Sequence, residues 1–100
     1  MNPVKLVYTN KAEDDLDSIF DYIAVGMNAL NYIDKIQSAI ENLITFPYTG
    51  VNCKAKGINR DCRILIFENY LIFYQIDEAN NEIKILRILH GSRKYHDLFR

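Results

Sequence analysis

Basic and aromatic side chains gather at the end of one strand-like segment in the second half of the chain. Arg87 lies among the apolar residues of this segment, and His90 follows at its end. Arginine can bind an anion, whereas histidine and tyrosine can transfer protons. The group therefore predicts a surface that meets an anionic or macromolecular partner. Its remaining members are Arg93, Lys94, Tyr95 and His96.

Two kinds of chemistry fit this group. In the first, the 2′-hydroxyl of an RNA attacks the adjacent phosphate, which requires a base, an acid and cations. His90, His96 and Tyr95 would transfer the protons, and the arginines would stabilise the developing charge. In the second, no bond is broken and the same side chains bind another macromolecule. The residues by themselves leave both possibilities open.

Arg87 is the unusual residue of the predicted strand 83–90. In an extended strand, residues 85, 87 and 89 share one face and residues 84, 86, 88 and 90 share the other. An arginine between isoleucines and leucines must reach the rim of the sheet, pair with a carboxylate, or face a groove that binds anions. The sequence does not choose among these three environments.

Further cations occur in the predicted loop 47–61. Lys54 and Lys56 lie within it, and Arg63 stands just inside the next strand. Residues 1–41 carry three basic and seven acidic side chains, a net charge of −4, whereas residues 42–100 carry nine and six, a net charge of +3. This asymmetry suits a protein of which one face approaches an acidic partner. We therefore count these three cations among the candidate target-binding residues, although solvated loop residues would look the same.

The elements that position these residues follow from apolar periodicity and turn residues. A short edge strand is predicted at 4–8, and a helix follows it, with Thr9 and Asn10 as candidate N-caps and Glu13 at capping-box spacing from Asn10. A second helix is predicted from about Ala29 to Phe46 and Pro47. Three strands complete the pattern, at 62–67, 70–76 and 83–90.

The 100 residues suffice for one domain, and we expect residues 1–100 to form a single one. Since no apolar run is long enough to span a bilayer and no signal peptide is evident, we expect a cytoplasmic protein without membrane contact. In a reducing compartment, Cys53 and Cys62 are expected to be free thiols. No motif indicates a metal or another cofactor.

Four segments resemble the RelE/ParE superfamily of toxins from bacterial type II toxin-antitoxin systems. Together they cover almost the whole chain, as a strand, a helical hairpin and three strands. The most specific likeness is to the ParE branch, at 69–74 (NYLIFY) and 85–93 (ILRILHGSR). The other two segments are 8–23 and 36–50.

The resemblance implies an α+β fold of order β-α-α-β-β-β, in which an antiparallel sheet packs against an N-terminal helical hairpin. It also implies a role in plasmid stabilisation and growth arrest, and a cognate antitoxin that covers the working surface in a hetero-oligomer. RelE-like members are mRNA interferases, metal-independent endoribonucleases that cut ribosome-bound mRNA. ParE-like members inhibit DNA gyrase.

Two departures from the RelE-like pattern favour the ParE-like function. Leu71 occupies the position at which RelE-like ribonucleases carry an arginine, and residues 64–66 are apolar where those enzymes carry basic residues. Loss of a phosphate-binding cation weakens stabilisation of the transition state. We therefore predict a toxin that binds gyrase, with Arg87 and Arg93 as the main contacts beside His90, Lys94 and Tyr95. The alternative is a ribosome-dependent endonuclease that uses His90 or His96 with Tyr95.

Overall fold

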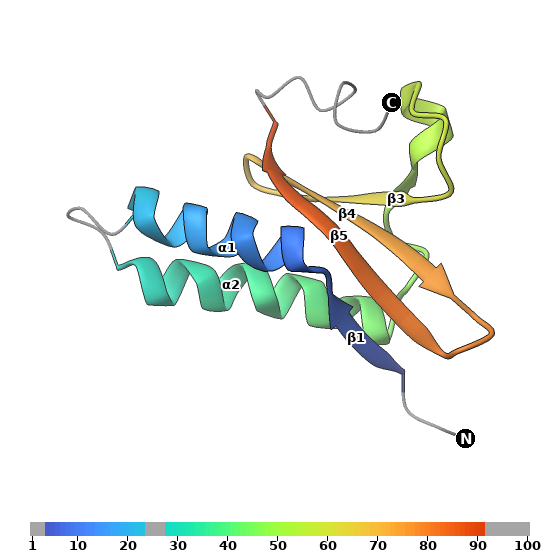
Figure 1. Ribbon diagram of the computed structural model, residues 1–100, viewed down its shortest axis with the longest axis horizontal. Coiled ribbons are helices and arrows are strands. Elements are labelled where there is room, and N and C mark those ends of the chain that lie inside the picture. Colours follow the sequence, from blue (N-terminus) through green and yellow to red (C-terminus); the bar gives the residue numbers. More distant parts are fainter. Residues whose placement is uncertain (1–3, 24–27, 92–100) are drawn as a thin grey trace.

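The computed structural model describes residues 4–23 and 28–91, which form an α+β fold of two helices and one sheet (Figure 1). The helices lie side by side and cover one face of the sheet. This arrangement confirms the predicted fold class. The elements are β1 (Lys5–Tyr8), α1 (Asn10–Ile23), α2 (Ala29–Glu41), η1 (Asn42–Ile44), β2 (Val51–Asn52), η2 (Cys53–Lys56), β3 (Arg63–Phe67), β4 (Tyr70–Asp77) and β5 (Glu82–His90).

The sheet has the strand order β1-β5-β4-β3-β2. β1 runs parallel to β5, with Leu6 beside Ile83, and all other neighbouring strands are antiparallel. A parallel pair needs a long connection, which the helices and the following strands provide. β2 corrects the prediction that 47–61 is wholly loop. Its two residues pair with Arg63 and Ile64, and two residues are too few to show a periodic pattern.

Side-chain caps determine where both helices begin. Thr9 Oγ1 accepts a hydrogen bond from the N–H of Ala12 at 3.1 Å and donates one to the carbonyl of Leu86 at 2.9 Å. The N-cap of α1 is therefore Thr9, and Asn10 is the first helical residue. At the start of α2, the side chain of Asn28 accepts a backbone hydrogen bond at 3.2 Å. Each cap satisfies an N–H group that has no partner within its helix.

The connection from α2 to β2 is fixed by Tyr74. α2 ends at Glu41 and a 3-10 turn follows, so the helix is shorter than predicted. The phenol of the fully buried Tyr74 donates to the carbonyl of Pro47 at 2.7 Å and accepts from the N–H of Gly50 at 2.9 Å. A Cβ at Gly50 would lie 2.6 Å from that phenol oxygen, so only glycine fits here.

A β-bulge explains the irregular alternation of β5. Phe73 of β4 pairs with Arg87 and Tyr74 pairs with Ile85, which leaves Leu86 without an opposite residue. An extra residue in one strand reverses the facing of every residue after it. Ile85 and Ile88 consequently face the same core although three positions separate them. The strict alternation assumed from the sequence therefore holds only up to Ile85.

Buried side chains form one core on each face of the sheet, since neighbours in β4 such as Phe73 and Tyr74 point to opposite faces. The helix-side core lies between the sheet and the helices, and the loop-side core lies under residues 53–62. The helix-side core comprises Ala12, Ile19, Ile36, Ile40, Leu43, Tyr70, Ile72, Tyr74, Ile83, Ile85 and Ile88. The loop-side core comprises Cys53, Ile58, Cys62, Ile64, Phe73 and Leu89.

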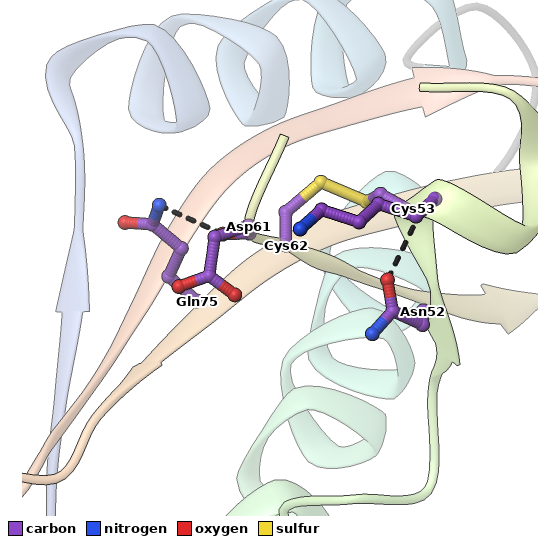
Figure 2. Close-up of a disulfide and its surroundings, with 6 residues drawn as sticks. Asn52, Cys53, Asp61, Cys62 and Gln75 are labelled. Carbon is purple, nitrogen blue, oxygen red and sulfur yellow. Dashed lines mark hydrogen bonds between the residues drawn. A yellow bond between two sulfur atoms is a disulfide. The ribbon is translucent and has the colours of Figure 1, made fainter. Parts of the chain in front are cut away.

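Cys53 and Cys62 form a disulfide, so the prediction of free thiols is wrong (Figure 2). Their Cα atoms are 5.3 Å apart. The pairing of β2 with the start of β3 brings the two residues together, and the N–H of Cys53 donates to the carbonyl of Cys62 at 2.9 Å. The prediction rested on the expected compartment alone, because no sequence pattern indicates the two-residue strand β2 that places these thiols side by side.

Candidate functional site

A groove lies between α1 and the ends of β4 and β5, and His90 is the predicted site residue that lines it. Its volume is about 390 Å³. One wall belongs to α1 and the other to the sheet, so the helix-side core supports it from below. Polar and apolar side chains alternate around it. They are Asp15, Ser18, Ile19, Tyr22, Tyr70, Ile88, Leu89 and His90.

His90 is exposed at the end of β5 and lies opposite Tyr70 of β4. The two rings meet edge to face, with centroids 5.4 Å apart and an angle of 83° between their planes. Burial raises the pKa of Tyr70, and the nearby Tyr22 adds to this effect. The Tyr70 phenol therefore stays protonated at neutral pH.

Arg87 pairs with Asp15 beside this groove. Nε of Arg87 lies 2.8 Å from Oδ2 of Asp15, and Nη2 lies 3.0 Å from Oδ1. The two side chains are only 17% and 11% exposed. The hydrogen bonds to Asp15 raise the pKa of Arg87, so the guanidinium remains charged. Of the three environments considered for Arg87, pairing with a carboxylate is the one observed. Contact between Arg87 and a target stays a prediction.

Asp15 also closes the open edge of β5. β1 ends at Tyr8, so the part of β5 beyond Leu86 has no strand on that side. The N–H of Ile88 donates instead to Oδ2 of Asp15 at 2.9 Å. One carboxylate thus satisfies a guanidinium and a backbone N–H that would otherwise be costly to bury. It thereby joins α1 to the strand that carries His90.

Arg63 lies elsewhere, opposite Tyr74, whereas His90 lies opposite Tyr70. Nη1 of Arg63 donates to the carbonyl of Gly50 at 2.7 Å, and its guanidinium carbon lies 5.0 Å from the ring centre of Tyr48. The Tyr48 hydroxyl donates in turn to Glu78, and this hydrogen bond raises the pKa of Tyr48. Arg63 therefore holds the segment 48–50 that precedes β2, and it does not line the groove.

Lys54 and Lys56 are exposed on η2, within the segment that the disulfide closes. The backbone N–H of Lys54 donates to Oδ1 of Asn52 at 3.0 Å, which caps this short helix. Gly57 ends it with a positive φ of 80°. These two lysines thus project from the loop side of the molecule, away from α1 and the groove.

The predicted site residues are therefore divided between places. His90 lines the groove and Arg87 lies beside it. Lys54 and Lys56 lie on the loop side, and Arg63 of β3 bonds to the segment 48–50 that precedes β2. The remaining predictions fall at Arg93, Lys94, Tyr95 and His96, which lie outside the described residues. Within 4–23 and 28–91, no group of three or more histidine, cysteine or acidic side chains could hold a metal ion. None of the helices in these ranges could span a membrane.

A family model described as the ParE toxin of the type II toxin-antitoxin system parDE matches residues 6–95. The chain belongs to the ParE toxin family. The toxin also resembles a chain of the chromosomal ParDE system from P. aeruginosa, with a TM-score of 0.70 and 25% sequence identity over 88% of this chain and 96% of that one. A search of curated proteins finds no significant match.

Two RelBE complexes share the fold of this ParE-family toxin. A chain of the RelBE2 complex from Mycobacterium tuberculosis superposes with a TM-score of 0.63 and 19% identity, over 89% of this chain and 99% of that chain. A chain of the intact E. coli RelBE complex superposes with a TM-score of 0.61 and 11% identity, over 90% of this chain and 99% of that chain. These likenesses extend the common fold to the wider superfamily predicted from the sequence.

Sequence reasoning missed the partners that the fold supplies to the ParE-family motif. Asp15 stands in the opening turns of a helix, where acidic residues are common, and its bond to Arg87 spans 72 positions of the chain. Tyr22 and Tyr70 fit ordinary helix and strand patterns, so neither marks a site by itself. A joint change of positions 15 and 87 among relatives would have been the signal for the ion pair, and a single sequence does not contain it.

Proposed function

We propose that this ParE-family toxin arrests growth in the bacterial cytoplasm by binding DNA gyrase, without cleaving a substrate. The supporting observation is the apolar character of the sheet face on the loop side. Ile64 and Leu71, which stand where RelE-like ribonucleases carry cations, pack with Phe73 around the loop-side core. RNA cleavage needs cations close to the scissile phosphate, and these positions provide none.

The proposed contacts with gyrase come from cations around this apolar face. Lys54 and Lys56 are exposed on η2, and Arg93 and Lys94 follow β5 in the sequence. Exposed cations favour an acidic partner surface and speed its association. Arg87 contributes with the small part of its guanidinium that Asp15 leaves exposed.

A cognate antitoxin is the second proposed partner. The solved structures that share this fold come from ParDE and RelBE toxin-antitoxin systems. We infer that an antitoxin segment covers the working surface of this toxin and keeps it inactive in a hetero-oligomer.

A ribosome-dependent endonuclease is the alternative function, and the groove is the observation that favours it. His90 is exposed there beside the protonated phenol of Tyr70. In this alternative, His90 would transfer a proton as the acid or the base, and the phenol of Tyr70 would donate a hydrogen bond beside it. His96 and Tyr95, which follow in the sequence, would join His90 in this reaction.

Pulse labelling after induction without the antitoxin separates the two functions. Gyrase inhibition predicts that thymidine incorporation falls first while methionine incorporation continues. An early loss of methionine incorporation alone would contradict the proposal and assign His90, Tyr95 and His96 to catalysis. Purified toxin should also inhibit supercoiling by gyrase.

Charge variants then test the contact residues. Lys54→Ala/Lys56→Ala should weaken inhibition of supercoiling by about tenfold or more, because two exposed cations of η2 are lost. A matched control, Lys11→Ala/Lys35→Ala, removes exposed lysines from α1 and α2 and should change it by less than about twofold. Equal losses in the two variants would show that only the overall charge matters.

A further inference from the structure

The disulfide encloses a short segment that carries proposed contact residues. Cys53 and Cys62 are the only two cysteines of the chain, so within one molecule their sulfurs can pair only with each other. Between them stand Lys54, Lys56 and Arg60. We propose that the Cys53–Cys62 disulfide is a redox switch that sets how firmly the loop 53–62 is held and hence how strongly the toxin binds its target. This inference rests on the proposed function.

Hydrogen bonds and packing also hold this loop in place. The N–H of Cys53 donates to the carbonyl of Cys62 at 2.9 Å, and the N–H of Ile58 donates to the carbonyl of Cys53 at 3.0 Å. The side chain of Gln75 donates to the carbonyl of Asp61 at 2.8 Å (Figure 2). β2, which leads into the loop, has only two residues. The disulfide is the covalent restraint that joins the two ends of the loop.

The packing of the loop depends on the same bond. Three of the six residues of the loop-side core, Cys53, Ile58 and Cys62, come from the loop itself. With the disulfide open, the covalent link between the two ends of the loop is lost, while Ile58 still packs with Ile64 and Phe73. A loop without this link samples more conformations, and its lysines then lose more entropy when they bind a partner.

The chemistry of the switch is thiol–disulfide exchange with a cellular dithiol. One thiolate of the reductant attacks a cystine sulfur and forms a mixed disulfide, and the other cysteine leaves as a thiolate that takes up a proton. The second thiol of the reductant then releases the remaining cysteine and becomes oxidised itself. Cys53 and Cys62 are 0% and 3% exposed, so the loop must open locally before the reductant can reach them.

In the proposed cytoplasmic compartment, this disulfide can open and close with the redox conditions. Disulfides in reducing compartments are for the most part transient or redox-sensing. In the reduced toxin the loop would be loose and binding weak. Oxidative conditions would close the loop and strengthen binding, so the same chain would be more potent under oxidative stress.

The test compares oxidised and dithiothreitol-reduced forms of the full chain, with Cys53→Ala/Cys62→Ala as the variant that has no thiol. Amide hydrogen exchange over residues 53–62 reports the order of the loop, and inhibition of gyrase supercoiling reports binding. Reduction should speed exchange of the loop amides and raise the half-inhibitory concentration by about tenfold. Reoxidation with glutathione disulfide should restore both, and the variant should resemble the reduced form with or without reductant.

Equal exchange rates in the two forms, or equal inhibition by them, would overturn the switch. If oxidised toxin leaves gyrase active, the proposed function has failed, and both forms are then compared in a cell-free translation assay. A redox-dependent potency there would keep the switch with a different target. Inactivity in both assays would overturn the binding role of the loop, while the exchange data would still show whether the disulfide orders it.

Discussion

The two faces of the sheet are stabilised in different ways. On the helix side, two amphipathic helices bury eleven core residues against the strands. On the loop side, the core has six residues, of which two are the joined cysteines. Closing a loop of this length with a disulfide contributes about 2–3 kcal/mol. Apolar area therefore suffices for the helix side, whereas a covalent bond compensates for the small core on the loop side.

The largest expected effect tests the difference between the two cores. Ile72→Ala removes a fully buried side chain from the helix-side core and should lower the free energy of unfolding by about 3–4 kcal/mol. Ile58→Ala on the loop side should cost about 1–2 kcal/mol, because the disulfide keeps the loop closed and a surface loop can relax around the cavity. Urea unfolding of the oxidised protein measures both. A larger cost for Ile58→Ala would reverse the comparison.

A smaller effect is expected where α1 meets the open edge of β5. Asp15→Ala leaves the Arg87 guanidinium and the N–H of Ile88 without their acceptor, which should lower the free energy of unfolding by about 2–3 kcal/mol. Asp17→Ala removes an exposed carboxylate from the same helix and should change it by less than about 0.5 kcal/mol.

A double-mutant cycle shows whether Arg87 acts mainly through this ion pair. Arg87→Ala and Asp15→Ala, alone and combined, should give a coupling energy of about 1 kcal/mol or more. A coupling near zero would contradict a stabilising role for the pair. Toxicity lost in Arg87→Ala but kept in Asp15→Ala, in soluble folded proteins, would instead show that Arg87 contacts the target.

The smallest expected effect is an alkaline loss of stability on the helix side alone. Burial raises the pKa of Tyr32 to about 12 from its usual 10.0, with the hydrogen bond to Glu68 as a further cause. Burial also raises the pKa of Tyr8, Tyr70 and Tyr74, which pack in the same core. Because the folded state favours the neutral phenol of Tyr32, its stabilisation is complete below pH 10 and is lost as the pH rises towards 12.

Unfolding at a series of alkaline pH values measures this loss. Tyr32→Phe keeps the ring but has no ionisable hydroxyl, so its stability should fall less steeply between pH 10 and pH 12 than that of the wild type. Identical slopes for the two proteins would contradict a raised pKa at Tyr32. Since the loop-side core contains no tyrosine among its residues, exchange of the loop 53–62 should change little over the same interval.

Much of the fold was predictable from local patterns in the sequence. Patterns such as the helical spacing of Ile36 and Ile40 and the β-branched run around Ile72 correctly indicated the helices, four of the five strands and the α+β class. The pairing of Asp15 with Arg87 and of Cys53 with Cys62 was not predictable, because each depends on tertiary contacts. The bulge at Leu86 was also missed, since it arises from the register of two strands and not from one of them.

The candidate site was predicted less completely than the fold. His90 was correctly placed at a strand end, but the groove around it is formed by Tyr22 and Ser18 of a distant helix. Arg63 was predicted to contact a target, although its guanidinium bonds to the carbonyl of Gly50 and packs on the ring of Tyr48. The residue types were therefore informative about chemistry, whereas the fold decided which of them share one surface.

The position of β5 has a consequence for the synthesis of this toxin. β5 lies between β1 and β4 and pairs with both, and Lys5 of β1 stands beside Glu82. The first strand made by the ribosome therefore waits for nearly the last one before it finds its neighbour, a separation that slows folding. The sheet of this toxin should thus close late in folding, because β1 gains its neighbour only after β5 has been made.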